Sequence, residues 1–297
     1  MKSNFSNPPQ KKLKSNFKNP LLFLFLCLFT STFTAQEAER SGSLFIIGGG
    51  SRPASMVERI IRESGLDEGG YAVILPMASS EPDTSYYYAK RQFTELGITN
   101  IFKQVYDSAS TSNVQKLDSL KNARLVYIPG GDQDRFMKAI AGTPAAEALK
   151  ANYRNGGMIA GTSAGAAVMS EDMITGNELK HPEYHSTFRN LETQNLELKH
   201  GLGMLQDVII DQHFVKRSRY NRLLTAILEN PEVKGIGIDE STAILVRNGT
   251  AEVVGESQVI VFTNPEASKR ASAGKLAGEG LKLDIYLHGD KFELEEK

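Results

Sequence analysis

The chain has 297 residues, of which 40% are hydrophobic and 23% are charged, a composition that excludes collagen-like, disordered and coiled-coil proteins. Its first 35 residues contain five lysines and no acidic residue, so the other 262 residues carry a net charge of −6 and form a poor surface for nucleic acid. The single cysteine excludes a disulfide framework. No apolar run approaches the roughly 20 residues of a spanning helix, so we expect no stable membrane span in the mature protein.

The N-terminal segment has the three-part order of a secretory signal. A lysine-bearing polar stretch leads into the nine-residue run LLFLFLCLF at 21–29, and mostly small and polar residues follow. We expect residues 1–35 to form the signal, with cleavage after Ala35 and loss of Cys27. The mature protein is then exported to the periplasm or the medium, an oxidising compartment in which a chain without cysteine is safe. The alternative is an N-terminus that stays in the membrane as an anchor.

Short apolar runs alternate with helix-length amphipathic segments in the first half of the mature chain. Nearly continuous apolar strands between helices are typical of a parallel sheet that is covered on both faces. The predicted fold class is therefore α/β, with a mostly parallel central sheet and helices on both faces. The predicted strands are 43–47, 71–76, 100–106, 123–129 and 157–161, and the predicted helices are 53–64, 85–97, a stretch that ends near 151 and one that begins near 164.

The pattern changes after residue 170. Periodicity is poor from 171 to 206, where polar residues and histidines accumulate, and we expect an inserted excursion or lid there. Alternation then resumes, and short runs beyond Gly249 predict antiparallel edge strands near the C-terminus. We expect 36–297 to form a single domain. The resumed elements are strands at 208–211, 235–239 and 242–246 and a helix at 216–230, and the late runs are 251–255, 258–262 and 281–287.

The most specific local motif is the G-x-S-x-G sequence at 161–165, which lies between a predicted strand and an apolar helix. Small neighbours permit a sharp strand-to-helix turn that lifts the Ser163 hydroxyl out of the sheet and leaves the Ala164 amide free for an oxyanion. The alternative is that these small residues only permit close packing of helix and sheet. The motif makes Ser163 a candidate nucleophile.

A serine nucleophile needs a base and a group that orients the base. All five histidines follow Ser163, and His213 lies just after a predicted strand, where open α/β sheets form their sites. Asp239 and Glu240 follow another strand, and either could orient the imidazole. The order nucleophile, histidine, acid differs from that of the α/β-hydrolases. The order therefore disfavours an ordinary esterase.

Four separate segments together resemble the cyanophycinase family, serine-type exopeptidases that cleave the storage polymer cyanophycin. They are similar in matching order over most of the mature chain, which is far more specific than one serine motif. The segments are PGGDQ at 129–133, GTSAGAA at 161–167, DQHFVKRSRYNRL at 211–223 and GIGIDESTA at 235–243.

The resemblance implies a fold similar to that of the class I glutamine amidotransferases and a homodimer. It also implies hydrolysis of cyanophycin to β-aspartyl-arginine dipeptides by acyl transfer, which needs no cofactor. It prefers Glu240 to Asp239, a choice that the residues alone leave open. The implied catalytic residues are Ser163, His213 and Glu240, the implied oxyanion amides are those of Ala164 and of Gly131 or Asp132, and the implied substrate-binding residues are Gln133, Asp211, Arg219 and Arg222.

The arginine assignment also has a physical basis. Arg219 and Arg222 are three residues apart on a predicted helix and share a face, whereas Arg217 is expected to point elsewhere. Cyanophycin is an aspartate chain with arginine attached to each side-chain carboxyl, and guanidinium groups bind the carboxylates of such a chain in a bidentate manner. Asp211 could meet a substrate cation. The alternative is a solvated basic helix face.

Three other functions fit the same motifs: an aspartyl dipeptidase with the same serine chemistry, an esterase that uses His288, and a secreted binding protein without catalysis. A dinucleotide loop is disfavoured at Gly48-Gly49-Gly50, because Pro53 stands where the fingerprint needs its last glycine, and we expect a tight turn near the mouth of the site instead. His181 and His185 have helical spacing, but Pro182 opposes a helix there and no cluster completes a metal site.

Overall fold

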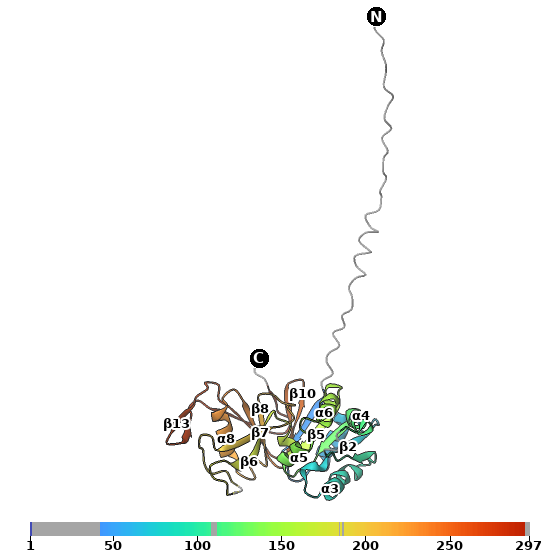
Figure 1. Ribbon diagram of the computed structural model, residues 1–297, viewed down its shortest axis with the longest axis horizontal. Coiled ribbons are helices and arrows are strands. Elements are labelled where there is room, and N and C mark those ends of the chain that lie inside the picture. The colour runs from blue at the N-terminus through green and yellow to red at the C-terminus, as the bar shows by residue number, and fades with distance from the viewer. Residues whose placement is uncertain (2–41, 108–111, 184, 186, 295–297) are drawn as a thin grey trace. The chain divides into compact units, whose positions relative to one another are not determined.

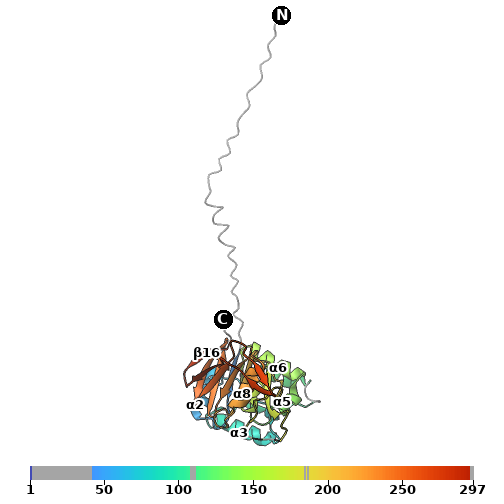
Figure 2. The ribbon, with the colours of Figure 1, turned by 90° about the vertical axis from the view of Figure 1, so that its left-hand side faces the viewer.

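The computed structural model describes Met1, 42–107, 112–183, 185 and 187–294 (Figures 1 and 2). Apart from Met1, the predicted signal segment 1–35 lies outside the described residues. All other described residues belong to one compact unit, Arg40–Lys297. Among the described residues, no helix is long and apolar enough to cross a membrane.

The larger of the two main sheets in this unit is a mixed sheet of eight strands. Its strands are β1 (Ser43–Ile47), β2 (Ala72–Ile74), β3 (Ile101–Lys103), β4 (Leu125–Ile128), β5 (Met158–Thr162), β10 (Thr242–Arg247), β11 (Thr250–Gly255) and β16 (Lys291–Glu293). They lie in the order β16-β11-β10-β1-β5-β4-β2-β3. The five strands from β1 to β3 pair in parallel, and β10, β11 and β16 extend the sheet antiparallel beyond β1.

Helices cover both faces of this sheet, as the sequence predicts for an α/β fold (Figure 1). Successive side chains of a strand point to opposite faces, so Leu44 and Ile46 enter one core and Phe45 and Ile47 enter the other. The first core includes α4 (Val114–Lys121), α5 (Gln133–Ile140) and α6 (Pro144–Arg154), and the second includes α2 (Ala54–Ser64) and α3 (Pro82–Thr94). The predicted helical stretch before residue 151 is thus two helices, because Gly142 has a φ of 68° and Pro144 begins the second.

A second sheet of four strands, in the order β15-β12-β9-β8, stands beside the first. Its strands are β8 (Val208–Gln212), β9 (Lys234–Ile238), β12 (Val259–Thr263) and β15 (Lys282–Tyr286). β8 and β9 are parallel, and β12 and β15 are antiparallel, as expected for the late strands. One face of this sheet packs on α8 (Tyr220–Glu229), and the other face contributes Ile210 and Ile236 to the core of the first sheet.

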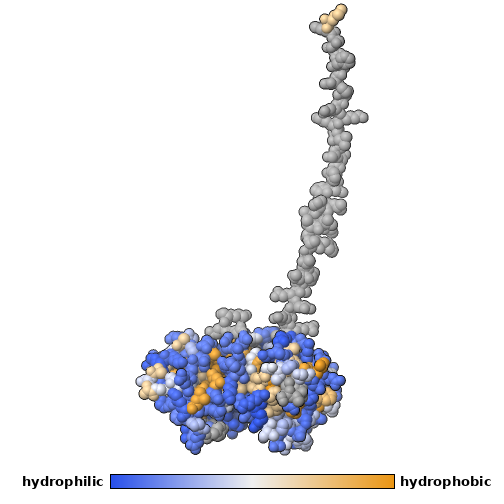
Figure 3. All heavy atoms as spheres, in the orientation of Figure 1, coloured by the Kyte–Doolittle hydropathy of each residue, from blue (hydrophilic) through white to orange (hydrophobic). Residues whose placement is uncertain are grey.

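The segment 171–206 contains a small antiparallel sheet of β6 (Asp172–Glu178) and β7 (Leu196–His200), called here the β6–β7 segment. β6 lies against β8. A hairpin of β13 (Arg270–Ser272) and β14 (Lys275–Ala277) meets this segment at a bridge between Glu192 and Lys275. Most of the surface in Figure 3 is hydrophilic, with apolar side chains in separate patches.

Candidate active site

Ser163 occupies a strained turn between β5 and α7 (Ala164–Ala167). Its φ of 54° and ψ of −109° are unusual for a residue with a side chain. The flanking glycines are required by space: a Cβ on Gly161 would lie 2.2 Å from the Gly165 carbonyl oxygen, and one on Gly165 would lie 2.1 Å from that of Ile128. The G-x-S-x-G motif thus forms the turn that presents a serine hydroxyl at the carboxyl end of the sheet.

His213 and Glu240 come from the second sheet and meet Ser163 at this edge. They follow the parallel strands β8 and β9, whose carboxyl ends lie side by side. His213 Nε2 is 2.9 Å from Ser163 Oγ, and His213 Nδ1 is 2.6 Å from Glu240 Oε1. A carboxylate only accepts hydrogen bonds, so Nδ1 carries the proton and Nε2 is left to accept from the serine. The three side chains have the geometry of a serine-protease triad.

The turn at Gly48–Gly50 joins the two sheets at the triad. The Gly48 carbonyl accepts the His213 amide at 2.7 Å, and the Gly49 carbonyl accepts the Ser241 amide at 2.9 Å. Gly49 has a φ of 114°, and a Cβ there would lie 2.3 Å from His213 Cε1. The tight turn expected near the site therefore lies directly beneath the imidazole.

The neighbouring acid Asp239 is engaged elsewhere. Its Oδ1 accepts the Lys216 amide at 2.9 Å, and its Oδ2 accepts the Ser257 hydroxyl at 2.7 Å. Asp239 thus holds the turn that follows β8, while Glu240 contacts the imidazole. The geometry selects Glu240, a choice that residue patterns alone left open.

Burial lowers the pKa of His213 below its ordinary value of 6.5. The hydrogen bond with Glu240 opposes this shift, and the positive charges of Arg217 and Arg219 add to it. The imidazole is therefore neutral at pH 7 and able to accept the serine proton, as a general base must.

Two main-chain amides, those of Ala164 and Gly131, are candidates for holding an oxyanion. Ala164 N–H is the first amide of α7 and has no partner within that helix. The Gly130 turn lies against the serine, since a Cβ on Gly130 would be 3.3 Å from Ser163 Cβ. Of the two predicted amides in this turn, that of Asp132 already donates to the Ala78 carbonyl at 2.9 Å. The arrangement therefore favours Gly131 with Ala164.

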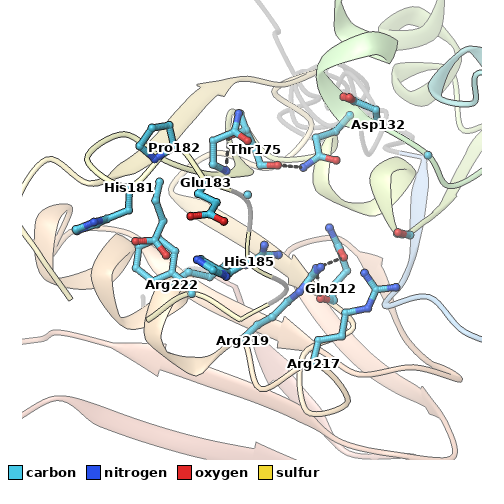
Figure 4. A pocket seen from close by; sticks show the side chains of 17 residues that line it. Asp132, Thr175, His181, Pro182, Glu183, His185, Gln212, Arg217, Arg219 and Arg222 are labelled. Carbon is cyan, nitrogen blue, oxygen red and sulfur yellow. Dashed lines mark hydrogen bonds between the residues drawn. The ribbon is translucent and has the colours of Figure 1, made fainter. Parts of the chain in front are cut away.

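A cavity of about 290 Å³ opens beside Ser163. Besides Ser163, its walls come from three places: the turn that starts α5, the stretch from the end of β8 to the first turn of α8, and the β6–β7 segment (Figure 4). Predicted residues on the wall are Gly131, Asp132, Gln133, Ser163, Arg219 and Arg222, and residues that sequence reasoning did not select are Thr175, Gly176, Asn177, Glu178, His181, Pro182, Glu183, His185, Phe188, Gln212 and Arg217.

Three arginines, Arg217, Arg219 and Arg222, form what we call the arginine wall of the cavity. The expectation that Arg217 points elsewhere is wrong. It assumed a helix from 216, but residues 214–219 form turns and α8 begins only at Tyr220. Arg217 and Arg219 therefore reach the same space (Figure 4).

Asp211 supports this wall and does not line the cavity. It is 1% exposed, and its Oδ2 accepts Arg222 Nε at 2.7 Å while its Oδ1 accepts Arg222 Nη2. Arg219 Nη1 lies 3.7 Å from the same carboxylate. The expected contact of Asp211 with a substrate cation does not fit this position, because its carboxylate is already occupied by Arg222.

Gln133 links the α5 turn to the β6–β7 segment. Its Nε2 donates to the carbonyls of Ile174 at 2.8 Å and Thr175 at 2.9 Å. Gln133 lines the cavity, and its amide nitrogen is bound to β6. Its predicted contact with substrate stays a prediction. The segment whose role the sequence left open thus contributes one side of the cavity.

His288 lies away from the cavity beside Ser163. His288 lies in a different surface pocket with Pro53 and Arg59, and its Nδ1 accepts the Gly255 amide at 3.2 Å. This position excludes the hypothesis of an esterase in which His288 acts as the base for Ser163. Among the described residues, no group of three His, Cys, Asp or Glu side chains could hold a metal ion.

A sequence profile described as Peptidase family S51 matches residues 44–254. A cyanophycinase of Trichormus variabilis is 33% identical over 235 residues, which are 76% of this chain and 76% of the relative. Cyanophycinases of Geminocystis herdmanii (31%, 84% of this chain, 93% of the relative) and Thermosynechococcus vestitus (32%, 93% and 86%) are similar. The crystal structure of a peptidase from an acI-B1 Actinobacterium has a TM-score of 0.61 at 24% identity, with 85% of this chain and 97% of that chain covered.

Proposed function

Because the chain belongs to peptidase family S51 and is a serine peptidase, we propose that its substrate is cyanophycin and its product β-aspartyl-arginine. The observation that carries this proposal is the arginine wall beside the Ser163–His213–Glu240 triad. Three guanidinium groups line the cavity, of which Arg222 already has Asp211 as its counter-ion. Such a positively charged wall suits a substrate that presents several carboxylates, as a polyaspartate chain end does. The cyanophycinases at 31–33% identity support the same assignment.

The reaction follows from the triad. His213 Nε2 takes the Ser163 proton, and Ser163 Oγ attacks the main-chain carbonyl of a terminal aspartyl unit. The amides of Ala164 and Gly131 hold the resulting oxyanion. The imidazolium, stabilised by Glu240, then protonates the leaving amine, and water repeats the sequence on the acyl-enzyme.

Purified protein incubated with insoluble cyanophycin tests the proposal. We expect soluble β-aspartyl-arginine in the mass spectrum of the supernatant. Ser163→Ala should abolish release, by a factor of about 10⁴ or more, and should still bind the polymer. Release of dipeptide by this variant, or its absence with the unaltered protein, contradicts the assignment.

The other functions give different results in the same assay. An aspartyl dipeptidase splits short peptides with N-terminal aspartate and leaves the polymer intact. A binding protein without catalysis releases nothing and is not labelled at Ser163 by a serine-directed fluorophosphonate. The arginine wall favours the polymer, because a dipeptide has fewer carboxylates to engage it.

We also propose that the protein is exported and acts on polymer outside the cell that makes it. The support is the lysine-bearing, then apolar, then small and polar order of residues 1–35. Fractionation of the producing cells tests this: recovery only in the cytosol contradicts export. The homodimer stays a prediction, to be checked by the mass of the protein in solution.

A further inference from the structure

The cavity presents charges of both signs, and they come from different segments. In the arginine wall, Arg217 and Arg219 lie between β8 and α8 and Arg222 lies on α8, whereas the β6–β7 segment brings Glu178 and Glu183. Figure 4 shows Glu183 on the opposite side of the cavity from Arg217 and Arg219, with the side chain of His185 between Glu183 and Arg219 in this view. A substrate with both anionic and cationic groups matches such a cavity.

The acids that line the cavity differ in what already binds them. Glu178 accepts hydrogen bonds from the side chains of Asn190 and Asn195 at 3.0 and 2.8 Å and is used to hold the β6–β7 segment. Asp132 accepts the Arg135 amide at 3.0 Å as the cap of α5. Among the described residues, Glu183 has no ion pair or hydrogen bond of its own.

Asp211, which the sequence suggested as the group that binds a substrate cation, is buried against Arg222. Glu183 is the better candidate for that role. We propose that Glu183 binds the guanidinium of the arginine carried by the substrate, while the arginine wall binds its carboxylates. This inference rests on the proposed function, because it assumes an aspartyl-arginine substrate. A carboxylate and a guanidinium form a bidentate, charge-assisted pair, which favours arginine over uncharged side chains of the same shape.

A pair of synthetic substrates tests the inference: a trimer of β-aspartyl-arginine and the same trimer with citrulline, whose urea group has the shape of guanidinium without its charge. For the unaltered protein we expect kcat/KM to be about tenfold higher with arginine, which corresponds to roughly 1.4 kcal/mol. Glu183→Gln should lower kcat/KM for the arginine trimer by about tenfold and leave the citrulline trimer unchanged. The side chain is exposed, so the variant should fold, which circular dichroism checks.

Glu171→Gln is the matched control, because Glu171 begins the same segment, is exposed and does not line the cavity. It removes the same charge and should leave both substrates unaffected. The inference is overturned if Glu183→Gln retains the full preference for arginine, or if Glu171→Gln loses as much of it. If the unaltered protein cleaves neither trimer, the proposed function itself fails, and this result is distinct from the other two.

Discussion

The pKa of the His213 imidazole is set by opposing effects. Burial and the charges of Arg217 and Arg219 lower its pKa, whereas Glu240 raises it. The protonated form is inactive as a base, so the acid limb of the pH profile reports this pKa. Because the pKa is below 6.5, Ser163 should remain reactive below that pH.

Removal of one of these charges should move the acid limb in a known direction. Arg217→Gln takes away a positive charge, which favours the imidazolium and raises the pKa of His213. We expect the limb to move to higher pH. The rate at which a neutral fluorophosphonate labels Ser163, measured against pH, gives the position of the acid limb. This measurement does not depend on substrate binding by Arg217.

Arg247→Gln is the control for that experiment. Arg247 pairs with Glu63 at 3.0 Å and does not line the cavity, so its removal should leave the limb in place. An unshifted limb in Arg217→Gln would show that solvent screens its charge from the imidazole.

At the scale of elements, the bond between Asp211 on β8 and Arg222 on α8 fixes the arginine wall to the second sheet. Asp211→Asn keeps the shape of the side chain but leaves the Arg222 charge buried without its counter-ion. We expect a loss of roughly 3 kcal/mol in the free energy of unfolding, measured by urea denaturation.

An exposed ion pair provides the comparison for Asp211. Glu279 and Arg270 pair at the surface, with side chains 79% and 66% exposed. Glu279→Gln should cost less than about 1 kcal/mol. An equal loss in both variants would contradict the structural role of the buried pair.

The Gly48–Gly50 turn leads to a prediction about the positioning of His213. In Gly49→Ala the new methyl group would overlap the imidazole ring, which must turn away from Ser163 and Glu240. We expect kcat to fall by about 100-fold or more with a smaller change in KM. Steady-state kinetics on the proposed substrate measure both constants.

Gly69→Ala is the control that distinguishes the effect of this overlap from the effect of backbone strain. Gly69 has a φ of 119°, close to the 114° of Gly49, but nothing lies within 4 Å of its Cβ position. Both variants carry the strain of alanine at positive φ, and only Gly49→Ala adds the overlap with the imidazole. Comparable loss of kcat in both would contradict the positioning role of Gly49.

At the scale of the whole molecule, strand ends made much of the site predictable. Ser163, His213 and Glu240 each follow a short apolar strand, and parallel strands bring their carboxyl ends to one edge. The α/β class followed from the same alternation. The local pattern did not decide between Asp239 and Glu240, and it did not show that β5 lies in a different sheet from β8 and β9.

Other features depend on long-range pairing or on the start of a helix. β8 and β9 have the apolar pattern of buried strands, but β10 takes the place beside β1, so they form a second sheet. The position of Arg217 depends on where α8 begins, which is decided by the turn after His213. The β6–β7 segment has no periodicity that would indicate its position against β8.

The division of the triad between two sheets bears on how the protein is made. A growing chain exposes Ser163 first, then His213, and Glu240 only later, and β10, which closes the sheet against β1, comes after all three. Contacts between such distant segments form late, when the intervening chain has been synthesised. The nascent polypeptide therefore cannot assemble the Ser163–His213–Glu240 arrangement before the chain through β10 has been synthesised.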